Sequence, residues 1–383
     1  TLRHMKFRRI VIKIGSSTLT AGSKQISPAH MLDLVREVCI LVRGGAEVVL
    51  VSSGAIAAGR ETLGFPELPR LVPAKQMLAA IGQPRLMAIY EQFFGIYDVK
   101  VAQVLLTRSD LTDRRRYLNA RNTLDALVSQ RVIPIINEND TVATEEIRFG
   151  DNDNLSAQVA NLIEADLLVL LTDQEGLYTT DPRQNPQAEL VREINTPEIP
   201  KEIWVSAGGT ADGIGTGGML TKLQAAALAR RGGTTVVIAS GKDAQNISRI
   251  VQKERKGTWI KPSDNHLEAR KRYILAGGAE PGRVVVDAGA EKDLIRGSSL
   301  LLAGIIKVSG EFDRGDTIHI QSVAGVGIAL GLANYSDRDL LKCAGHQSNE
   351  IENLLGFTYG DEAVHRNNLV MLEKAKGASD GGA

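Results

Sequence analysis

The chain is poor in cysteine and contains no long hydrophobic run. Its 383 residues include two cysteines, Cys39 and Cys343, and this count excludes a disulfide framework or a cysteine-based metal site. No run of roughly eighteen apolar residues occurs, so we predict no membrane-spanning helix. The first residues also lack the layout of a signal peptide. These absences favour a cytoplasmic protein that keeps both thiols reduced.

The chain also has no excess of charge of either sign. The chain has 45 Lys and Arg residues against 45 Asp and Glu residues, which gives a formal net charge of zero. This balance argues against nucleic acid as the main ligand, although a local basic patch is compatible with it. With 43% hydrophobic and 23% charged residues, the composition is that of a folded globular protein. The length predicts two domains or three.

Short apolar runs predict the strands of one sheet. They lie at residues 10–14, 47–52, 101–106, 132–136, 167–171 and 235–239. Between the first two runs, Ser27 and Pro28 mark the start of a helix, and Gly44 marks its end. Because the runs are apolar throughout rather than alternating, we expect a parallel sheet covered by helices on both faces. The fold class is therefore α/β, with a three-layer αβα domain around a mainly parallel sheet.

The character of the chain changes after Gly257. Short strand-like runs alternate there with glycine-containing turns, which predicts a second, small β-rich domain. We place the αβα domain at residues 6–257, a linker at residues 258–280 and the β-rich domain at residues 281–360. Residues 361–383 are predicted to form a C-terminal extension with a disordered end.

Two lysines about two hundred residues apart stand beside glycine-containing loops. Lys13 lies where an apolar strand runs into a Gly-Ser loop, and Lys222 follows the glycine loop at residues 213–218. Such loops expose backbone N–H groups, which suit phosphate, especially at a helix N-terminus. Residues 213–218 match G-x-G-x-x-G, but no strand leads into them, so a nicotinamide cofactor is disfavoured; the chain has no P-loop motif either. If the fold brings both ammonium groups together, they can share a migrating phosphoryl group, as in a kinase.

Polar residues follow several of the predicted strands, at the edge where parallel sheets bind their ligands. Ser53 and Gly54 can offer a hydroxyl and backbone N–H groups to a carboxylate. Asp140 suits an ammonium group, and Asn137 suits either charge. Together these residues predict a pocket for a small zwitterion.

Acid and amide side chains are dense at residues 150–154. We expect Asp153 to lie between the two lysines, because a carboxylate there prevents their mutual repulsion. Asn152 is expected to donate hydrogen bonds to a substrate carboxylate. The alternative is a purely structural cluster in which Asn154 caps the following helix. A calcium loop is disfavoured because its required glycine and terminal glutamate are missing.

Taken together, the segments around these residues resemble the amino acid kinase family, and within it the members that act on glutamate. They are residues 11–15, 51–59, 135–140, 150–154, 171–173 and 215–222. The chain after Gly282 resembles a PUA domain. The resemblance covers nearly the whole chain and implies ATP-dependent phosphorylation of the γ-carboxylate of L-glutamate. The product, L-glutamyl 5-phosphate, opens proline biosynthesis.

The resemblance also implies roles for individual residues. The implied catalytic residues are Lys13, Lys222 and Asp153. The implied glutamate-binding residues are Lys13, Ser53, Gly54, Asn137, Asp140 and Asn152. The implied ATP-binding residues are Thr172, Asp173, Thr216, Gly217, Gly218, Met219, Leu220, Thr221 and Lys222. Family members commonly have a small polar residue at the position of Leu220, where the backbone can still serve.

Further expectations come from the same resemblance. It implies ATP as co-substrate together with Mg²⁺, for which we assign no protein ligand. It also implies feedback inhibition by proline at or near the glutamate pocket, and a homo-oligomer, either a dimer or a tetramer.

Two other functions remain open from the sequence. The PUA-like domain alone would fit an RNA-binding or RNA-modifying protein, although the neutral net charge weighs against it. An amino acid kinase with a different acceptor would keep the fold and change the substrate. The appended β-rich domain and residues 150–154 disfavour that second alternative.

Overall fold

The computed structural model describes residues 7–69, 71–143, 152–208, 218–275 and 282–372. The chain forms two compact units: the first consists of residues 1–112 and 119–266, and the second of residues 113–118 and 267–383. The predicted disordered end lies outside the described residues, which stop at residue 372.

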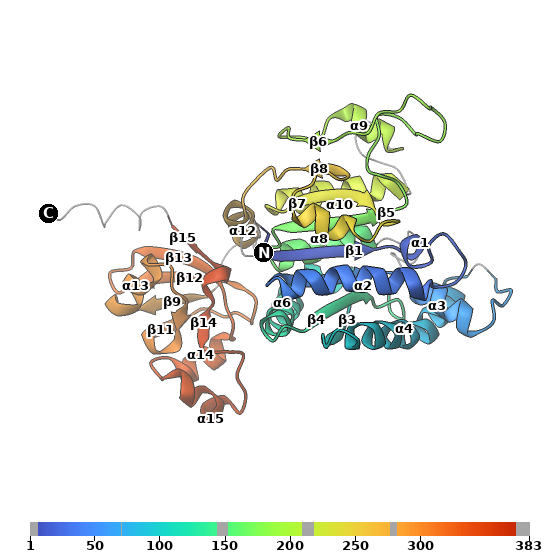
Figure 1. Ribbon diagram of the computed structural model, residues 1–383. Helices are drawn as coiled ribbons and strands as arrows, with labels where there is room; N and C mark the ends of the chain where they lie inside the picture. The colour runs from blue at the N-terminus through green and yellow to red at the C-terminus, as the bar shows by residue number, and fades with distance from the viewer. Residues whose placement is uncertain (1–6, 70, 144–151, 209–217, 276–281, 373–383) are drawn as a thin grey trace. The chain divides into compact units, whose positions relative to one another are not determined.

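An eight-stranded sheet forms the centre of the first unit (Figure 1). In spatial order its strands are β3 (Val101–Leu106), β4 (Ile133–Glu138), β2 (Glu47–Ser52), β1 (Arg9–Ile14), β5 (Leu167–Thr172), β7 (Thr235–Ser240), β8 (Thr258–Ile260) and β6 (Glu193–Ile194). Every pairing is parallel except that of β7 with β8. All six predicted strands are present, and the mainly parallel sheet confirms the predicted fold class.

Helices cover both faces of this sheet. Against one face pack α2 (Pro28–Arg43), α4 (Val72–Gly95) and α11 (Asn246–Val251), and against the other α8 (Asn152–Leu162) and α10 (Gly218–Arg231). The remaining helices of the first unit are α1 (Ser16–Leu19), α3 (Ala55–Thr62), α5 (Arg108–Thr112), α9 (Lys201–Ser206) and most of α6 (Arg114–Ser129), whose first turn belongs to the second unit. Helix α12 (His266–Leu275) begins at the unit boundary and lies almost wholly in the second unit. The helix predicted between Ser27 and Gly44 is α2, with the Ser27 hydroxyl accepting a hydrogen bond from a first-turn N–H.

The alternation of side chains along β1 determines which way Lys13 points. Ile10, Ile12 and Ile14 belong to the hydrophobic core beneath α2 and α11. Because successive strand residues face opposite sides, Val11 and Lys13 point toward the other layer, where α8 crosses β1. A lysine within an otherwise apolar buried strand thus reaches the helix that carries Asp153.

Helices α3 and α4 touch through their main chains. Gly59 on α3 lies against the backbone of Leu78, and Gly82 on α4 lies against the carbonyl oxygen of Ala55. A Cβ atom at either glycine would overlap these atoms. This contact holds α4 close to the loop after β2, which carries Ser53.

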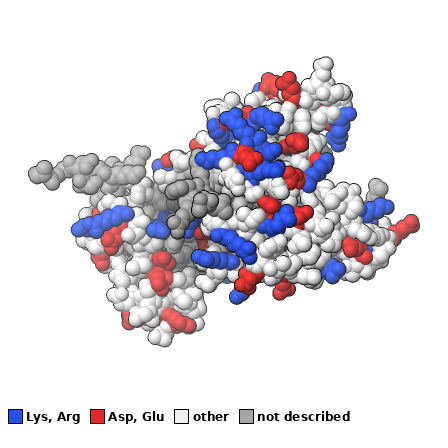
Figure 2. All heavy atoms as spheres, viewed as in Figure 1, with Lys and Arg blue, Asp and Glu red and all other residues white. Residues whose placement is uncertain are grey.

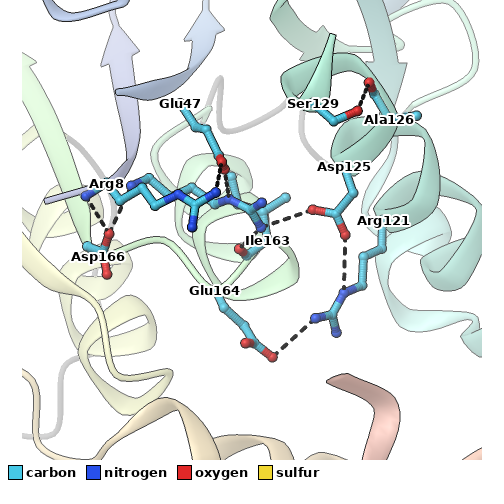
Figure 3. Close-up of polar contacts among 10 residues, drawn as sticks. Arg8, Glu47, Arg121, Asp125, Ala126, Ser129, Ile163, Glu164 and Asp166 are labelled. Carbon is cyan, nitrogen blue, oxygen red and sulfur yellow. Dashed lines mark hydrogen bonds and ion pairs between the residues drawn. The ribbon is translucent and has the colours of Figure 1, made fainter. Parts of the chain in front are cut away.

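Ion pairs connect the elements at the amino-terminal edge of the sheet (Figure 3). The Arg9 guanidinium contacts Glu47 at 2.7 Å and Asp125 at 2.9 Å. Arg121 then joins Asp125, at 3.8 Å, to Glu164, at 3.2 Å. Burial would raise the pKa of Glu47, but Arg9 and Arg8 hold it below its usual value. The network ties β1 and β2 to α6 and to the turn before β5.

The second unit is β-rich, as predicted (Figure 1). Its five-stranded sheet has the order β11 (Ile305–Ser309), β9 (Arg283–Val286), β12 (Thr317–Ser322), β13 (Gly327–Leu332) and β15 (Leu369–Met371). A two-stranded sheet pairs β10 (Leu300–Leu301) with β14 (Glu362–Val364). Its helices are α13 (Ala288–Ile295), α14 (Asp337–Cys343) and α15 (Ile351–Leu355), with three 3₁₀ turns, η1 (Leu302–Gly304), η2 (Ser348–Glu350) and η3 (Arg366–Asn368).

The division into units differs from the expected boundaries at two places. Residues 258–280, expected as a linker, include β8, which pairs with β7 in the main sheet. Residues 361–383, expected as an extension, include β14 and β15, which complete the sheets of the second unit. The short length of these strands explains why the sequence pattern did not reveal them.

We predict that Gly82→Ala destabilises the protein by about 1–3 kcal/mol, because the added methyl group must displace backbone rather than a side chain. Gly95→Ala, on the same helix with open space around its Cβ position, is the matched control and should be neutral or slightly stabilising. Urea unfolding followed by circular dichroism measures both. Equal stability of the two variants would contradict the close backbone contact.

Candidate active site

Three charged residues that are far apart in sequence meet at the carboxyl-terminal edge of the sheet. Lys13 Nζ lies 2.5 Å from Asp153 Oδ1, and Lys222 Nζ lies 3.1 Å from Asp153 Oδ2. The Thr221 hydroxyl donates to the same Oδ2 at 2.8 Å. The predicted convergence of both lysines on Asp153 is therefore present, and we call Lys13, Asp153 and Lys222 the clamp.

The local packing of two helices produces this meeting. Helices α8 and α10 approach each other closely through small, fully buried side chains such as Ala157 and Ala226. Asp153 occupies the first turn of α8, where the partial positive charge of the helix N-terminus favours a carboxylate. Lys222 lies in the first turns of α10 and reaches back across to it.

Asp153 remains ionised despite its burial. Its exposed fraction is 2%, so burial alone would raise the pKa of the carboxyl group. The charges of Lys13 and Lys222, with the hydrogen bonds from Lys13 and Thr221, instead lower this pKa to about 2. The clamp thus holds two ammonium groups around one carboxylate and carries a net positive charge.

Polar side chains from the ends of β2 and β4 meet Asn152, the neighbour of Asp153 at the start of α8. We use the name acceptor pocket for the predicted glutamate-binding residues other than Lys13, namely Ser53, Gly54, Asn137, Asp140 and Asn152. Asn152 donates to the Ser53 hydroxyl at 2.9 Å and to the Asn137 side-chain oxygen at 2.8 Å. Gly54 has a φ of 112° at the N-terminus of α3, a conformation that favours glycine. The Ser53 N–H is already bonded to Ile14, which leaves its hydroxyl for a ligand.

Burial raises the pKa of the Asp140 carboxyl group to about 6, and no opposite charge among the described residues lowers it. Asn137 is 3% exposed and contacts the pocket chiefly through Asn152. Its amide nitrogen donates to Gln83 on α4 at 2.9 Å. Gln83 was not predicted from the sequence, because nothing in its local pattern shows that it faces β4.

A cavity of about 940 Å³ opens next to the clamp. Of the predicted ATP-binding residues, it is lined by Thr172, Asp173, Gly218, Met219 and Lys222. Thr221 contacts Asp153, whereas Leu220 is fully buried in α10. Thr216 and Gly217 lie outside the described residues.

The same cavity has lining residues that sequence reasoning missed. They include Tyr178, Arg183, Lys201 and Glu202, which come from the chain after β5 and from α9. No motif marks these positions, and their common surface appears only when β5 and α10 are placed together. The aromatic ring and mixed charges suit a ligand with both a ring system and phosphate groups.

The chain is similar to known proteins over nearly its whole length. Residues 8–240 match the model of the amino acid kinase family, and residues 282–355 match that of the PUA domain. Glutamate 5-kinase of Shewanella sediminis is 52% identical over 97% of this chain and 100% of its own length. Glutamate 5-kinase of Shewanella oneidensis is 53% identical over the same shares, and that of Photobacterium profundum is 53% identical over 95% and 96%. A solved UMP kinase from Bacillus anthracis covers 67% of this chain, and 97% of its own length, at 18% identity and a TM-score of 0.46, too distant to inform function.

The chain therefore belongs to the amino acid kinase family and carries a PUA domain after its kinase domain. Within that family it is similar, over nearly its whole length, to the glutamate 5-kinases.

The pKa of Asp153 makes a prediction about stability. Its folded value of about 2 lies below the unfolded value of about 3.9, so the carboxylate stabilises the fold above pH 4. That contribution, about 2 kcal/mol, is lost as the pH falls toward 2. Asp153→Asn should therefore be less stable than wild type at pH 7, and the difference should shrink between pH 5 and pH 3.

Urea unfolding at several pH values measures this difference. Asp33→Asn, at a half-exposed ion pair with Arg36, is the control and should show little difference at any pH. A gap between wild type and Asp153→Asn that stays constant down to pH 3 would contradict the charged role of Asp153.

Proposed function

We propose that the protein transfers the γ-phosphoryl group of ATP to the γ-carboxylate of L-glutamate, forming L-glutamyl 5-phosphate for proline biosynthesis. The observation that carries this proposal is the clamp, in which Lys13 and Lys222 flank Asp153 and Lys222 lines the cavity. Similarity to glutamate 5-kinases over 97% of the chain supports glutamate as the acceptor.

The chemistry requires positioning more than proton transfer. The γ-carboxylate of glutamate is already a nucleophile, so no general base is needed. Its oxygen forms a bond to the γ-phosphorus while the bond from that phosphorus to the bridging oxygen breaks, and ADP leaves with the electron pair. The ammonium groups of Lys13 and Lys222 offset charge on the phosphoryl oxygens, and Asp153 keeps both amines in place.

Magnesium fits this site as a companion of the nucleotide. Within the described residues, no group of three or more His, Cys, Asp or Glu side chains could hold a metal ion. Both oxygens of Asp153 already contact lysines. We therefore infer that Mg²⁺ is held mainly by the ATP phosphates, whose charge it neutralises. Among the carboxylates that line the cavity, Asp173 is the one that directly follows β5.

Further properties belong to the same proposal. The acceptor pocket recognises a small zwitterion, so proline, which has the same α-amino and carboxylate charges, is the inhibitor we infer for it. A homo-oligomer, dimer or tetramer, and a cytoplasmic location are inferred from the family resemblance. None of the helices in the described part of the chain has the length and apolar character to cross a bilayer.

The alternative functions have less support. On the face drawn in Figure 2, Lys and Arg side chains gather over the upper part of the first unit with acidic side chains among them. The formal net charge of zero over the whole chain weighs against RNA as the main ligand. Salt-sensitive binding of structured RNA in a gel-shift assay would favour an RNA-binding role for the PUA domain. A different acceptor would be revealed by a panel of carboxylate and phosphate substrates.

We predict that Lys13→Ala and Lys222→Ala each lower kcat by about a hundred- to a thousandfold, because each removes one preorganised charge from the transferring group. ATP-dependent formation of glutamyl hydroxamate measures the rate. Lys201→Ala, at the cavity wall outside the clamp, should affect the KM for ATP more than kcat. Full activity of Lys13→Ala, or no activity of wild type with glutamate, would reject the proposal.

Asp140 predicts a pH dependence of glutamate binding. With its pKa near 6, the carboxyl group is ionised above pH 6 and accepts the α-ammonium group. Below pH 6 it becomes protonated, so kcat/KM for glutamate should fall toward a tenfold loss per pH unit. Asp140→Asn should have low kcat/KM and should lose this dependence. A wild-type profile that is flat from pH 5 to pH 8 would contradict the role of Asp140.

A further inference from the structure

A chain of side-chain amides runs from the acceptor pocket to the edge strand β3. The Asn152 nitrogen donates to Asn137 Oδ1 at 2.8 Å, and the Asn137 nitrogen donates to Gln83 Oε1 at 2.9 Å. Gln83 Nε2 lies 3.4 Å from Oε1 of Gln103, which is exposed on β3. Asn152, Asn137 and Gln83 are buried, so water cannot easily replace these partners.

The main chain gives this relay one direction. The backbone N–H of Glu138 donates to Asn137 Oδ1 at 2.9 Å. Because a backbone N–H can only donate, the Asn137 amide cannot be turned around without leaving this donor facing another donor. The Asn137 nitrogen must then face Gln83, whose oxygen is the acceptor, and Asn152 must donate to Asn137.

The direction of the relay determines what the pocket presents to a ligand. The second amide hydrogen of Asn152 goes to Ser53 Oγ at 2.9 Å, so both of its donors are used within the protein. Only the oxygen of Asn152 remains for a ligand, and this differs from the donor role expected from the sequence. Ser53, having accepted from Asn152, keeps its hydroxyl hydrogen to donate.

We propose that Gln83 is a positioning residue for substrate recognition: through Asn137 it turns the Asn152 oxygen toward the α-ammonium group of the amino acid. Ser53 then donates to a carboxylate on the same substrate. This inference rests on the proposed function, because it presupposes an amino acid in the acceptor pocket. Gln83 is well placed for the role, because the adjacent Gly82 holds α4 against the main chain of α3.

Gln83→Met tests the proposal, since methionine keeps the length and buried volume of glutamine and removes the strong acceptor. We expect the KM for glutamate to rise about ten- to a hundredfold as the Asn152 oxygen loses its fixed direction. The KM for ATP should not change. Competitive inhibition by glutarate, which has both carboxylates of glutamate and no amine, should also be unchanged.

Two further variants separate positioning from general damage. Gln83→Glu retains an oxygen acceptor toward Asn137 and should return the KM for glutamate to within a few-fold of wild type. Gln92→Met, an exposed glutamine on the same helix, is the matched control and should behave as wild type.

The KM values distinguish failure of the positioning role from failure of the proposed function. An unchanged KM for glutamate in Gln83→Met, or an equal weakening of glutamate and glutarate, overturns the positioning role while leaving the proposed function intact. A wild-type protein that does not phosphorylate glutamate overturns the proposed function and this inference with it.

Discussion

The carboxylate of Asp153 between two ammonium groups is the interaction on which the rest of the site depends. Without an anion between them, the ammonium groups of Lys13 and Lys222 would repel each other. Burying either charge alone would also cost a large desolvation free energy. Their exposure is small because one buried anion contacts both. The anion in turn remains charged because it has two cationic partners and stands at a helix N-terminus. None of the three charges is stable in this position without the other two.

The sheet supports the clamp from its opposite edge. β1 lies between β2 and β5, so the strand that carries Lys13 has paired neighbours on both sides. At its other end Arg9 belongs to the ion-pair network of Glu47, Asp125, Arg121 and Glu164 (Figure 3). Strong polar contacts thus sit at both ends of one buried strand. The cavity beside Lys222 opens at the carboxyl end, and a second cavity, lined in part by Arg8 and Glu47, lies at the amino end.

Much of the fold could be predicted from the sequence because its strands are continuous apolar runs and its polar residues follow them directly. Lys13 was recognisable as a lysine in an apolar run, Lys222 because it follows a glycine loop, and Asp153 because it belongs to a dense cluster of acid and amide side chains. The helix α4 was harder, because Pro84 lies within it and its apolar residues show no clear helical period. In the second unit β13 begins at Gly327, and a glycine in that setting is typical of a turn.

The parts of the site that escaped prediction depend on contacts between distant elements. Gln83 and Asn137 are 54 positions apart in the chain, and the local sequence around neither residue predicts their hydrogen bond. The roles within the acceptor pocket were also beyond the sequence, because a side-chain amide can donate or accept. Its orientation here follows from a backbone N–H of Glu138, which only the three-dimensional arrangement brings into contact.

The glycine contact between α3 and α4 has a consequence for how new specificity can arise in this protein. Where Gly59 and Gly82 meet, main chain lies on main chain, with no layer of side chains that could grow thicker or thinner. The distance between the two helices is therefore not an adjustable variable. A change of specificity toward a longer or shorter dicarboxylic acid must therefore come from substitutions of the side chains at the strand ends. The α3–α4 contact behind them cannot shift in small steps.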